Sequence, residues 1–487
     1  MCKAVGPIAL TVMCTRGGTV HSLPTAAKHN IYNVLFIAVD DLRPELGCYG
    51  VTDAQSPNID AFAKTSMVFN RHYAAVATCG ASRYALLTGI SPSVSHVTSS
   101  NEALFKGLGS LKQMEQTGAQ TMPELFRRSG YHTTCIGKIS HTPDGRVYGY
   151  DGSGDGRPEL PGAWDDLVTP FGVWNRGWGT FFAYPNGRHR EDKKGNNDLM
   201  DFTAEGDTAL PDGQMAGVAS DTIKKYANSK QRFFLGLGFY KPHLPFVAPK
   251  QDWDAFEGSR LLPVAHPEKS TSPYWHDSGE FFRYKMPWAK SAPLSTESHL
   301  ITRRAYLACV RYTDRQVGDV LRVLKATGLD KTTVVVLWGD HGWHLGDQQI
   351  YGKHSPFERS MRSTLIVHVP NSHPTVHSTD SLVESTDIYP TLLDLCKPSF
   401  MTMANPIKGQ SLVPILNNPA HSIHKAAVSY WNNAVSIRSN THRLMAKRTA
   451  AGGFTDIVLL DLSASLDANE NIASQHPDIV EELLKAL

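Results

Sequence analysis

The sequence lacks the features of three broad protein classes. Its 7 cysteines are widely scattered and form no CxxC pair, a pattern typical of neither a disulfide framework nor a zinc site. Beyond the N-terminal segment, no apolar run is long enough to span a bilayer. The formal net charge is only +2, so no broad electrostatic field favours nucleic acid or a membrane surface. An acidic ligand would therefore have to meet a local basic site.

Length and composition predict an ordinary globular protein with more than one part. A chain of 487 residues, 41% hydrophobic and 19% charged, favours a large α/β domain plus a smaller one. At the N-terminus, Lys3 precedes an apolar run over residues 4–14, and a segment of small residues reaches Ala27. This pattern is that of a short secretory signal over residues 1–27, and it predicts export to the periplasm or the cell exterior.

One short stretch carries the strongest chemical signal. Residues 78–89 read Thr-Cys-Gly-Ala-Ser-Arg-Tyr-Ala-Leu-Leu-Thr-Gly, a loop of small residues that leads into a helix pattern and stops at glycine. Cys79 would lie at the helix N-terminus, where unpaired N–H groups favour an anion, and Arg83 one turn above it. A sulfur nucleophile, or a group made from it, beside a guanidinium suits attack on a tetrahedral oxyanion ester. A buried cysteine near a surface arginine is the alternative.

Two acidic strand ends predict a metal site. The apolar run that begins at Asn33 is typical of a strand buried on both faces, and it ends in Asp40 and Asp41. A second buried strand leads into Asp340 and His341. Functional sites of open α/β sheets lie at the carboxyl ends of strands, and oxygen donors clustered there suit Ca²⁺ or Mg²⁺. An exposed acidic strand end or a helix cap is the alternative.

Basic side chains follow two further predicted strands. Lys138 and His141 come just after a strand over residues 132–136, and three residues apart they can converge on one anion. His243 follows an apolar strand over residues 233–239 and stands between two prolines that fix the direction of its loop. Surface residues of ordinary loops are the alternative for all three side chains.

Irregular segments between these motifs are candidates for substrate contact. The glycine-rich stretch over residues 141–166 is long for a loop of a compact domain, which favours function or mobility. Aromatic residues within 164–184 could form a wall for sugar stacking, although packing onto the domain is the simpler interpretation. Arg188, His189 and Arg190 could bind a carboxylate or a second sulfate, but a solvated basic turn is the preferred interpretation.

The last third of the chain changes in pattern. Residues 250–300 are rich in proline and are expected to shape a substrate entrance. A helix is predicted over residues 217–229, and a long amphipathic helix over residues 304–327. From residue 426 onward, four short strand patterns follow one another and a helix over 477–487 ends the chain. This predicts a small antiparallel sheet with a packed helix.

Taken together, these motifs resemble the type I sulfatases, and most closely the iduronate-2-sulfatase-like enzymes. Cys-x-Ala-Ser-Arg matches the motif in which that family oxidises cysteine to formylglycine, although the family usually has proline in place of Ala81. Gly-Lys-x-x-His over 137–141, Lys-Pro-His-x-Pro-Phe over 241–246 and Asp-His-Gly over 340–342 also occur in family order. Lys353 matches the family lysine that reaches the sulfate ester oxygen. Several separated motifs in order make coincidence improbable.

The resemblance implies a fold and cofactors. A catalytic alkaline-phosphatase-like or sulfatase-like α/β domain over residues 28–420, with a large, mixed, mostly parallel sheet between helices, would be followed by a small antiparallel-sheet subdomain over 421–487. Formylglycine (3-oxoalanine) would be made from Cys79 by a formylglycine-generating or anaerobic sulfatase-maturating enzyme. Ca²⁺, with Mg²⁺ as the less favoured ion, would be held by Asp40, Asp41, Cys79, Asp340 and His341. The implied catalytic residues are Cys79, Arg83, Lys138, His141, His243 and Lys353.

The implied activity is hydrolysis of a sulfuric ester on a sulfated sugar, such as a uronic acid or an algal or glycosaminoglycan-type polysaccharide. The resemblance implies that Lys138, His243 and Lys353 neutralise the sulfuryl group. It also implies that His141 takes the proton that allows sulfate to leave. Two alternatives remain. A phosphodiester or phosphonate monoester hydrolase of the same superfold would share the metal site. A non-catalytic protein that binds sulfated glycans would result if Ala81 prevents maturation.

Overall fold

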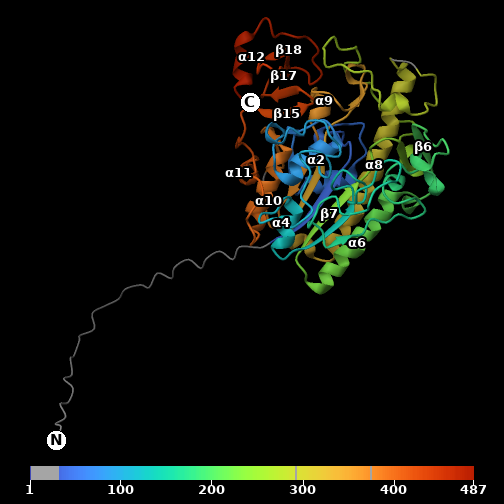
Figure 1. Ribbon diagram of the computed structural model, residues 1–487. Coiled ribbons are helices and arrows are strands. Elements are labelled where there is room, and N and C mark those ends of the chain that lie inside the picture. Colours follow the sequence, from blue (N-terminus) through green and yellow to red (C-terminus); the bar gives the residue numbers. More distant parts are fainter. Residues whose placement is uncertain (2–31, 291–292, 373–375) are drawn as a thin grey trace, which may run out of the picture. The chain divides into compact units, whose positions relative to one another are not determined.

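The computed structural model describes Met1 and residues 32–290, 293–372 and 376–487 (Figure 1). From Ile31 to Leu487 the chain forms one compact unit. The signal predicted over residues 1–27 lies outside the described residues, Met1 excepted. None of the helices described is both long and apolar enough to cross a membrane.

The centre of the unit is an eight-stranded sheet in the order β13-β2-β12-β9-β1-β7-β4-β5. The strands β9, β1, β7, β4 and β5 are parallel, whereas β12 runs antiparallel to both of its neighbours. The predicted large, mixed, mostly parallel sheet is therefore confirmed. Its strands are β1 (Asn33–Val39), β2 (Met67–Phe69), β4 (His132–Gly137), β5 (Asp166–Leu167), β7 (Phe233–Phe239), β9 (Thr333–Gly339), β12 (Leu365–His368) and β13 (Ser378–Thr379).

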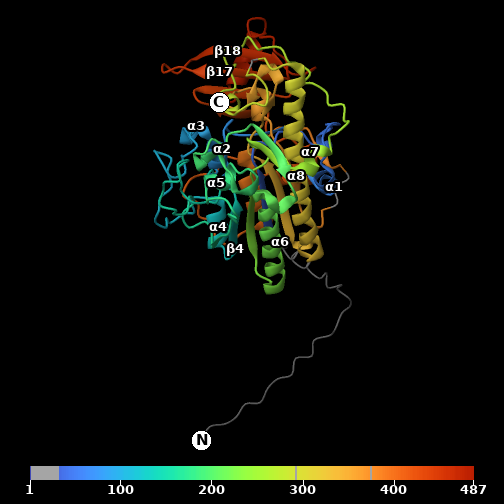
Figure 2. The ribbon, with the colours of Figure 1, turned by 90° about the vertical axis from the view of Figure 1, so that its right-hand side faces the viewer.

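Helices cover both faces of this sheet. Alternate residues of β1 belong to two different hydrophobic cores, because successive side chains of a strand point to opposite faces. Figure 1 shows β7 between α4 and α10 on one side and α6 and α8 on the other, and Figure 2 gives the view at 90°. One face packs against α2 (Cys79–Thr88), α4 (Met122–Arg128) and α10 (Ile388–Cys396), and the other against α1 (Pro57–Ala63), α6 (Pro211–Ser229) and α8 (Thr296–Ala326).

Two helices begin earlier than the sequence pattern predicts. The pattern predicts a start at residue 217 for α6 and at residue 304 for α8, whereas they begin at Pro211 and Thr296. Proline favours the first helical turn, and the Ser295 hydroxyl accepts a hydrogen bond from the Ser298 N–H. The first turns of both helices are polar, so the apolar stripe from which a helix is predicted does not extend over them.

The C-terminal part contains the predicted antiparallel sheet of four strands. One face of this sheet packs against the last helix through Ile437, Leu444 and Leu459. The division at residues 420 and 421 stays a prediction, because the chain from Ile31 onward clusters as one unit. The elements are β15 (Ala427–Trp431), β16 (Ala434–Arg438), β17 (His442–Arg448), β18 (Phe454–Asp461) and α12 (Pro477–Leu484).

Short elements complete the structure, and several of them border the site described below. The strands are β3 (His72–Tyr73), β6 (Met200–Ala204), β8 (Phe246–Pro249), β10 (His344–Leu345), β11 (Tyr351–Gly352) and β14 (Val383–Glu384). The helices are α3 (Pro92–Ser95), α5 (Trp178–Phe181), α7 (Lys250–Asp254), α9 (Glu358–Met361), α11 (Val413–Asn417) and the 3₁₀ helix η5 (Phe281–Arg283).

Candidate active site

Four central strands bring their carboxyl ends to the same edge of the sheet. Because β9, β1, β7 and β4 are parallel neighbours, the loops that follow them meet there. The predicted site residues in these loops are Asp40, Asp41, Lys138, His141, His243, Asp340 and His341.

Cys79 is the first residue of α2, as the sequence predicts. Asn101 fixes this helix start, because its side-chain oxygen accepts from the Gly80 N–H at 2.8 Å and from the Thr78 hydroxyl at 3.1 Å. A Cβ atom on Gly80 would lie 2.3 Å from the Asn101 Cα, so glycine is required for this approach. The helix ends at Gly89 in the left-handed conformation, with a φ of 70°.

Ala81 occupies a position in α2 where proline would also fit the backbone. The Ser82 N–H donates to the Thr78 carbonyl at 3.0 Å and thereby begins the helical hydrogen-bond ladder. Ala81 precedes that bond, so its N–H is one of the unpaired groups of the helix start. Proline costs no intrahelical hydrogen bond at such a position. The local geometry at Cys79 is thus compatible with either residue.

Arg83 lies one turn after Cys79 and is fully buried. Its Nε donates to Asp340 Oδ2 at 3.0 Å and its Nη2 to Asp40 Oδ1 at 3.2 Å. Burial opposes the charge, but Asp340 and Asp40 outweigh it and raise the pKa of Arg83 above its ordinary value. Arg83 therefore fixes the two carboxylates from behind and does not line the cavity described below.

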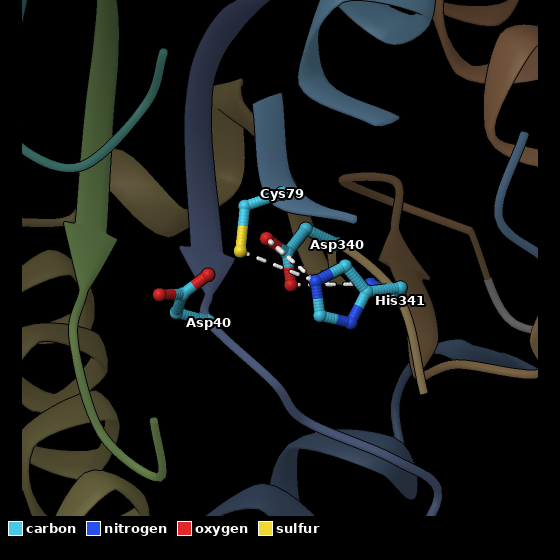
Figure 3. A group of neighbouring side chains, drawn as sticks. All are labelled: Asp40, Cys79, Asp340 and His341. Atoms are coloured by element: carbon cyan, nitrogen blue, oxygen red, sulfur yellow. Dashed lines mark hydrogen bonds and ion pairs between the residues drawn. The ribbon is translucent and has the colours of Figure 1, made fainter. Parts of the chain in front are cut away.

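The predicted metal ligands converge on one point. Figure 3 shows the Cys79 sulfur pointing toward Asp40, Asp340 and the His341 ring. Cys79 Sγ lies 3.3 Å from His341 Nε2, which is 3.4 Å from Asp41 Oδ1. One ligand atom from each of Asp40, Cys79, Asp340 and His341 lies within 4.8 Å of the others, and Asp40, Asp41, Cys79 and His243 form an overlapping group.

The chemistry of this cluster fits a divalent cation. Asp41 Oδ2 is buried and has no hydrogen-bond partner among the described residues. Burial also raises the pKa of Asp41 to about 7, the sign of a carboxylate with too little compensation. Three buried carboxylates, those of Asp40, Asp41 and Asp340, supply the hard oxygen donors that Ca²⁺ and Mg²⁺ prefer.

Two lysines lie against the cluster. Lys353 Nζ donates to Asp41 Oδ1 at 2.8 Å and to Cys79 Sγ at 3.4 Å, and Lys138 Nζ donates to Asp40 Oδ2 at 2.7 Å. Burial disfavours the charged form of Lys353, but the neighbouring acidic groups favour it, and Asp41 has the largest effect among them. The pKa of Lys353 is therefore raised well above its ordinary value. Two ammonium groups therefore stand beside Cys79, where they can meet an anionic ligand.

The two predicted histidines differ in their surroundings. His243 Nδ1 lies 2.6 Å from the Leu244 carbonyl oxygen, which can only accept, so this nitrogen carries the proton. Burial lowers the pKa of His243 to about 4. His141 Nδ1 has no partner among the described residues, and burial lowers the pKa of this ring well below its ordinary value. A neutral imidazole of this kind can accept a proton.

A cavity of about 870 Å³ opens in front of the cluster. Of the predicted residues, Cys79, Lys138, His141, His243 and Lys353 line it, whereas the carboxylates, Arg83 and His341 do not. Trp178 from the aromatic stretch also lines it, and its ring lies 5.2 Å from that of His141. The cavity is large enough for more than a single sulfate group.

Some cavity residues were not predicted from the sequence. Glu280 and Arg283 come from the segment expected to shape an entrance, but no motif marks them individually. His354 also lines the cavity, and its ring stacks on Trp431 of β15 with centroids 4.8 Å apart. Arg190, for which a solvated turn was preferred, also lines the cavity. No sequence motif indicates that Trp431 lines the cavity, because the C-terminal sheet that carries it is distant in sequence from the other site residues.

Sequence comparisons identify a family and relatives of the chain. The profile of the family described as "Sulfatase" matches residues 32–397, which is more than half of the chain. A "Sulfatase" of Formosa agariphila is 32% identical over 391 residues, covering 74% of this chain and 69% of the relative. "Iduronate 2-sulfatase" of Mus musculus is 30% identical over 369 residues, covering 72% of this chain. The match spans 62% of that mouse protein, less than two thirds of its length.

Structural comparison extends the likeness to a second chemistry. The phosphonate monoester hydrolase of Agrobacterium radiobacter superposes with a TM-score of 0.71 at 20% identity, covering 93% of this chain and 95% of that one. At this identity only the fold is shared. The fold alone therefore does not distinguish a sulfate ester from a phosphorus ester as the substrate.

Proposed function

The chain belongs to the sulfatase family, and we propose that it removes sulfate from a sulfated sugar by means of a formylglycine made from Cys79 and a bound Ca²⁺. The family is one of sulfuric ester hydrolases and implies a formylglycine and a divalent metal. The observation that carries the assignment is the position of Cys79 at the start of α2. Its sulfur lies within 3.4 Å of His341 and Lys353 and beside the buried carboxylates.

Each residue of the site has a distinct task in this proposal. Ca²⁺ would be held by Asp40, Asp41 and Asp340, together with His341, which directly follows Asp340. The bound ion would withdraw charge from sulfate oxygens. The hydrated aldehyde of formylglycine would supply the attacking hydroxyl. Arg83 keeps Asp40 and Asp340 in position through its two hydrogen bonds.

The cavity side of the site would handle the sulfate. Lys138 and Lys353 place ammonium groups beside Cys79, and His243 lies on the same wall. The two ammonium groups would stabilise negative charge as the S–O bond breaks, by positioning and electrostatics. His141, neutral and with an unpartnered nitrogen, would accept the proton that accompanies release of sulfate.

The proposal implies a partner and a compartment. A separate maturation enzyme, either formylglycine-generating or anaerobic, would oxidise Cys79, as the likeness of its motif to that of the family implies. Export to the periplasm or cell exterior rests on the N-terminal sequence pattern. The sugar is proposed to be a sulfated uronic acid or a related unit of a polysaccharide, on the likeness to the mouse iduronate 2-sulfatase.

A phosphodiester or phosphonate monoester hydrolase is the second candidate. The shared fold with the Agrobacterium enzyme favours it, because the same sheet edge can present a metal and cations to phosphorus esters. A non-catalytic glycan-binding protein is the third candidate, and it would follow from a failure to mature the Ala81 motif.

The first test is the mass of the tryptic peptide that contains Cys79, taken from protein made in the native host. We expect the mass of an aldehyde in place of the thiol. The same protein is then assayed with aryl sulfate, aryl phosphonate and aryl phosphodiester substrates, and the sulfate should be hydrolysed fastest. Faster hydrolysis of a phosphorus ester would favour the second candidate. An unmodified thiol in every molecule would favour the third.

A further inference from the structure

More basic side chains line the cavity than bind the carboxylates near Cys79, which we call its reaction end. Four lysine and arginine side chains line it, those of Lys138, Lys353, Arg190 and Arg283, together with the carboxylates of Glu191 and Glu280. The two lysines donate to carboxylates of the metal site. The two arginines come from other segments and have no contact with those carboxylates among the described residues. They are therefore available for a different part of the ligand.

An aromatic wall connects Arg190 to the reaction end. The His243 ring lies 4.7 Å from the Phe181 ring and 6.1 Å from the Phe182 ring. The Arg190 guanidinium lies 3.3 Å above that same Phe182 ring. Tyr150 stacks on Trp178 at 4.3 Å and extends the wall. A sugar ring along this wall would place one substituent near His243 and another near Arg190.

Contacts within the protein hold Arg190 in place, but they do not occupy all of its N–H groups. Its Nη1 donates to the Tyr284 hydroxyl at 2.9 Å, and its Nε and Nη2 contact Glu191 Oε1 at 2.8 and 2.7 Å. A guanidinium has five N–H groups, so one on each terminal nitrogen remains for a ligand. Its side chain is 26% exposed, at the cavity.

Arg283 lines the same cavity and has no ion-pair partner among the described residues. It is the last residue of η5 and is exposed, and its guanidinium forms no ion pair or hydrogen bond with any described residue. Its carbonyl accepts from Asn197 Nδ2 at 2.8 Å, which joins this segment to the loop that carries Arg190. Tyr284, the next residue, is the one that binds Arg190. Two loops distant in sequence thus bring the two arginines to one side of the cavity.

We propose that Arg190 and Arg283 form a subsite for a second anionic group of the saccharide, a carboxylate or a second sulfate, one sugar ring away from the sulfate that is removed. This inference rests on the proposed function and narrows its substrate class to saccharides with two negative groups. Arginine suits the task because its planar fork binds carboxylate and sulfate oxygens in pairs. Glu191 keeps Arg190 oriented, and the free charge of Arg283 supplies the net attraction.

The test is the variant Arg283→Ala, which removes no contact between described side chains. Its kcat/KM is measured on 4-nitrophenyl sulfate, which has no second anion, and on a sulfated uronide. We expect a loss of roughly 10- to 100-fold on the uronide, mainly through KM, and less than about a twofold change on the aryl sulfate. Arg190→Lys should give a loss of the same kind, because lysine keeps the charge but not the fork.

Further substrates identify the second anion. A loss on the uronide that disappears with its methyl ester assigns the subsite to a carboxylate. A loss on a disulfated hexosamine but not on its monosulfated form assigns it to a sulfate. The matched control is Arg260→Ala, an exposed arginine outside the cavity, which should change neither rate. Equal losses on the aryl sulfate, or no loss on any doubly anionic sugar, would overturn the proposal.

A binding measurement separates this inference from the proposed function. If the wild-type chain hydrolyses no sulfate ester, the affinities of the same sugars are measured by calorimetry on wild type and Arg283→Ala. Tenfold weaker binding of the doubly anionic sugar by the variant would support the subsite even without turnover. Equal affinities, or no binding by the wild type, would overturn it.

Discussion

Two buried clusters of charged side chains in this protein serve different ends. One is the candidate metal-site cluster of the carboxylates Asp40, Asp41 and Asp340 described above. The other, here called the junction cluster, consists of Glu358, Arg438 and Arg443, and it joins α9 to the C-terminal sheet. All six side chains are nearly inaccessible to solvent. They differ in whether the carboxylate oxygens find fixed donors.

In the junction cluster both carboxylate oxygens are satisfied. Glu358 Oε2 accepts from Arg443 Nη2 at 2.6 Å and from Arg438 Nε at 3.2 Å, and Oε1 accepts from the Tyr73 hydroxyl at 2.9 Å. Burial opposes the charge, but Arg443 and Arg438 outweigh it and lower the pKa of Glu358 to about 2. Burial instead raises the pKa of Asp41 to about 7, and one of its oxygens has no hydrogen-bond partner among the described residues. A closed cluster stabilises the fold, and an open one can bind a ligand.

The largest expected effect separates chemistry from folding. Cys79→Ala should lower turnover of a sulfate ester by at least roughly 10⁴-fold, because the nucleophile is lost. The control is Cys309→Ala on α8, which also removes a fully buried sulfur but lies in the hydrophobic core. Both variants are assayed for turnover and for unfolding in urea, and only the first should lose turnover. Detectable turnover by Cys79→Ala would contradict the assignment.

The next effect concerns the junction cluster. Glu358→Gln should lower the free energy of unfolding by about 3–5 kcal/mol, because two buried arginines lose their counter-charge. Equilibrium denaturation measures it. The control is Glu481→Gln, whose partner Lys485 lies 3.6 Å away in an exposed pair, and it should cause no measurable change. A cost below about 1 kcal/mol for Glu358→Gln would mean that the junction cluster does not stabilise the fold.

A pH titration tests the same cluster in the wild type. The pKa of Glu358 is lowered in the folded chain, so its contribution is fully present above the ordinary value of 4.5 and is lost toward pH 2. Between pH 6 and pH 3 the difference in unfolding free energy between wild type and Glu358→Gln should shrink by roughly 2 kcal/mol. Urea unfolding of both proteins at pH 6, 4 and 3 measures the difference. A constant difference would contradict the lowered pKa.

The smallest expected effect tests the open cluster. Ca²⁺ at 100 times its dissociation constant should raise the free energy of unfolding by about 2.7 kcal/mol, since only the folded site binds it. Asp340→Asn should remove most of this increase, whereas the exposed Asp221→Asn should retain it. Thermal unfolding with and without Ca²⁺ gives the comparison. Equal stabilisation of wild type and Asp340→Asn would place the ion elsewhere.

Sequence patterns predicted the centre of the fold because its signals are local. Long buried runs identified β1, β7 and β9, and the residues immediately after them became the candidate site. The helix at Cys79 and the antiparallel C-terminal strands were also confirmed. The direction of β12 was not predictable from its own residues, because strand pairing depends on what lies beside it.

The outer part of the cavity could not be predicted in the same way. Arg283 lies in a segment without periodicity, and Trp431 belongs to a sheet far along the chain. Neither is marked by a motif or a strand end. The sequence shows that the turn at Arg190 is basic. It does not show whether the Arg190 side chain faces solvent or a ligand, because that depends on its packing against the Phe182 ring.

The sequence by itself determined the buried strands, the helix that begins at Cys79 and the set of polar residues that follow each strand. These depend on hydrophobic runs and turn residues within a few positions. Only the tertiary structure decided which carboxylate oxygens stay without donors and which loops bring Arg190 and Arg283 to one wall. Hydrogen-bond satisfaction and charge balance are sums over neighbours hundreds of residues apart, so no local pattern contains them.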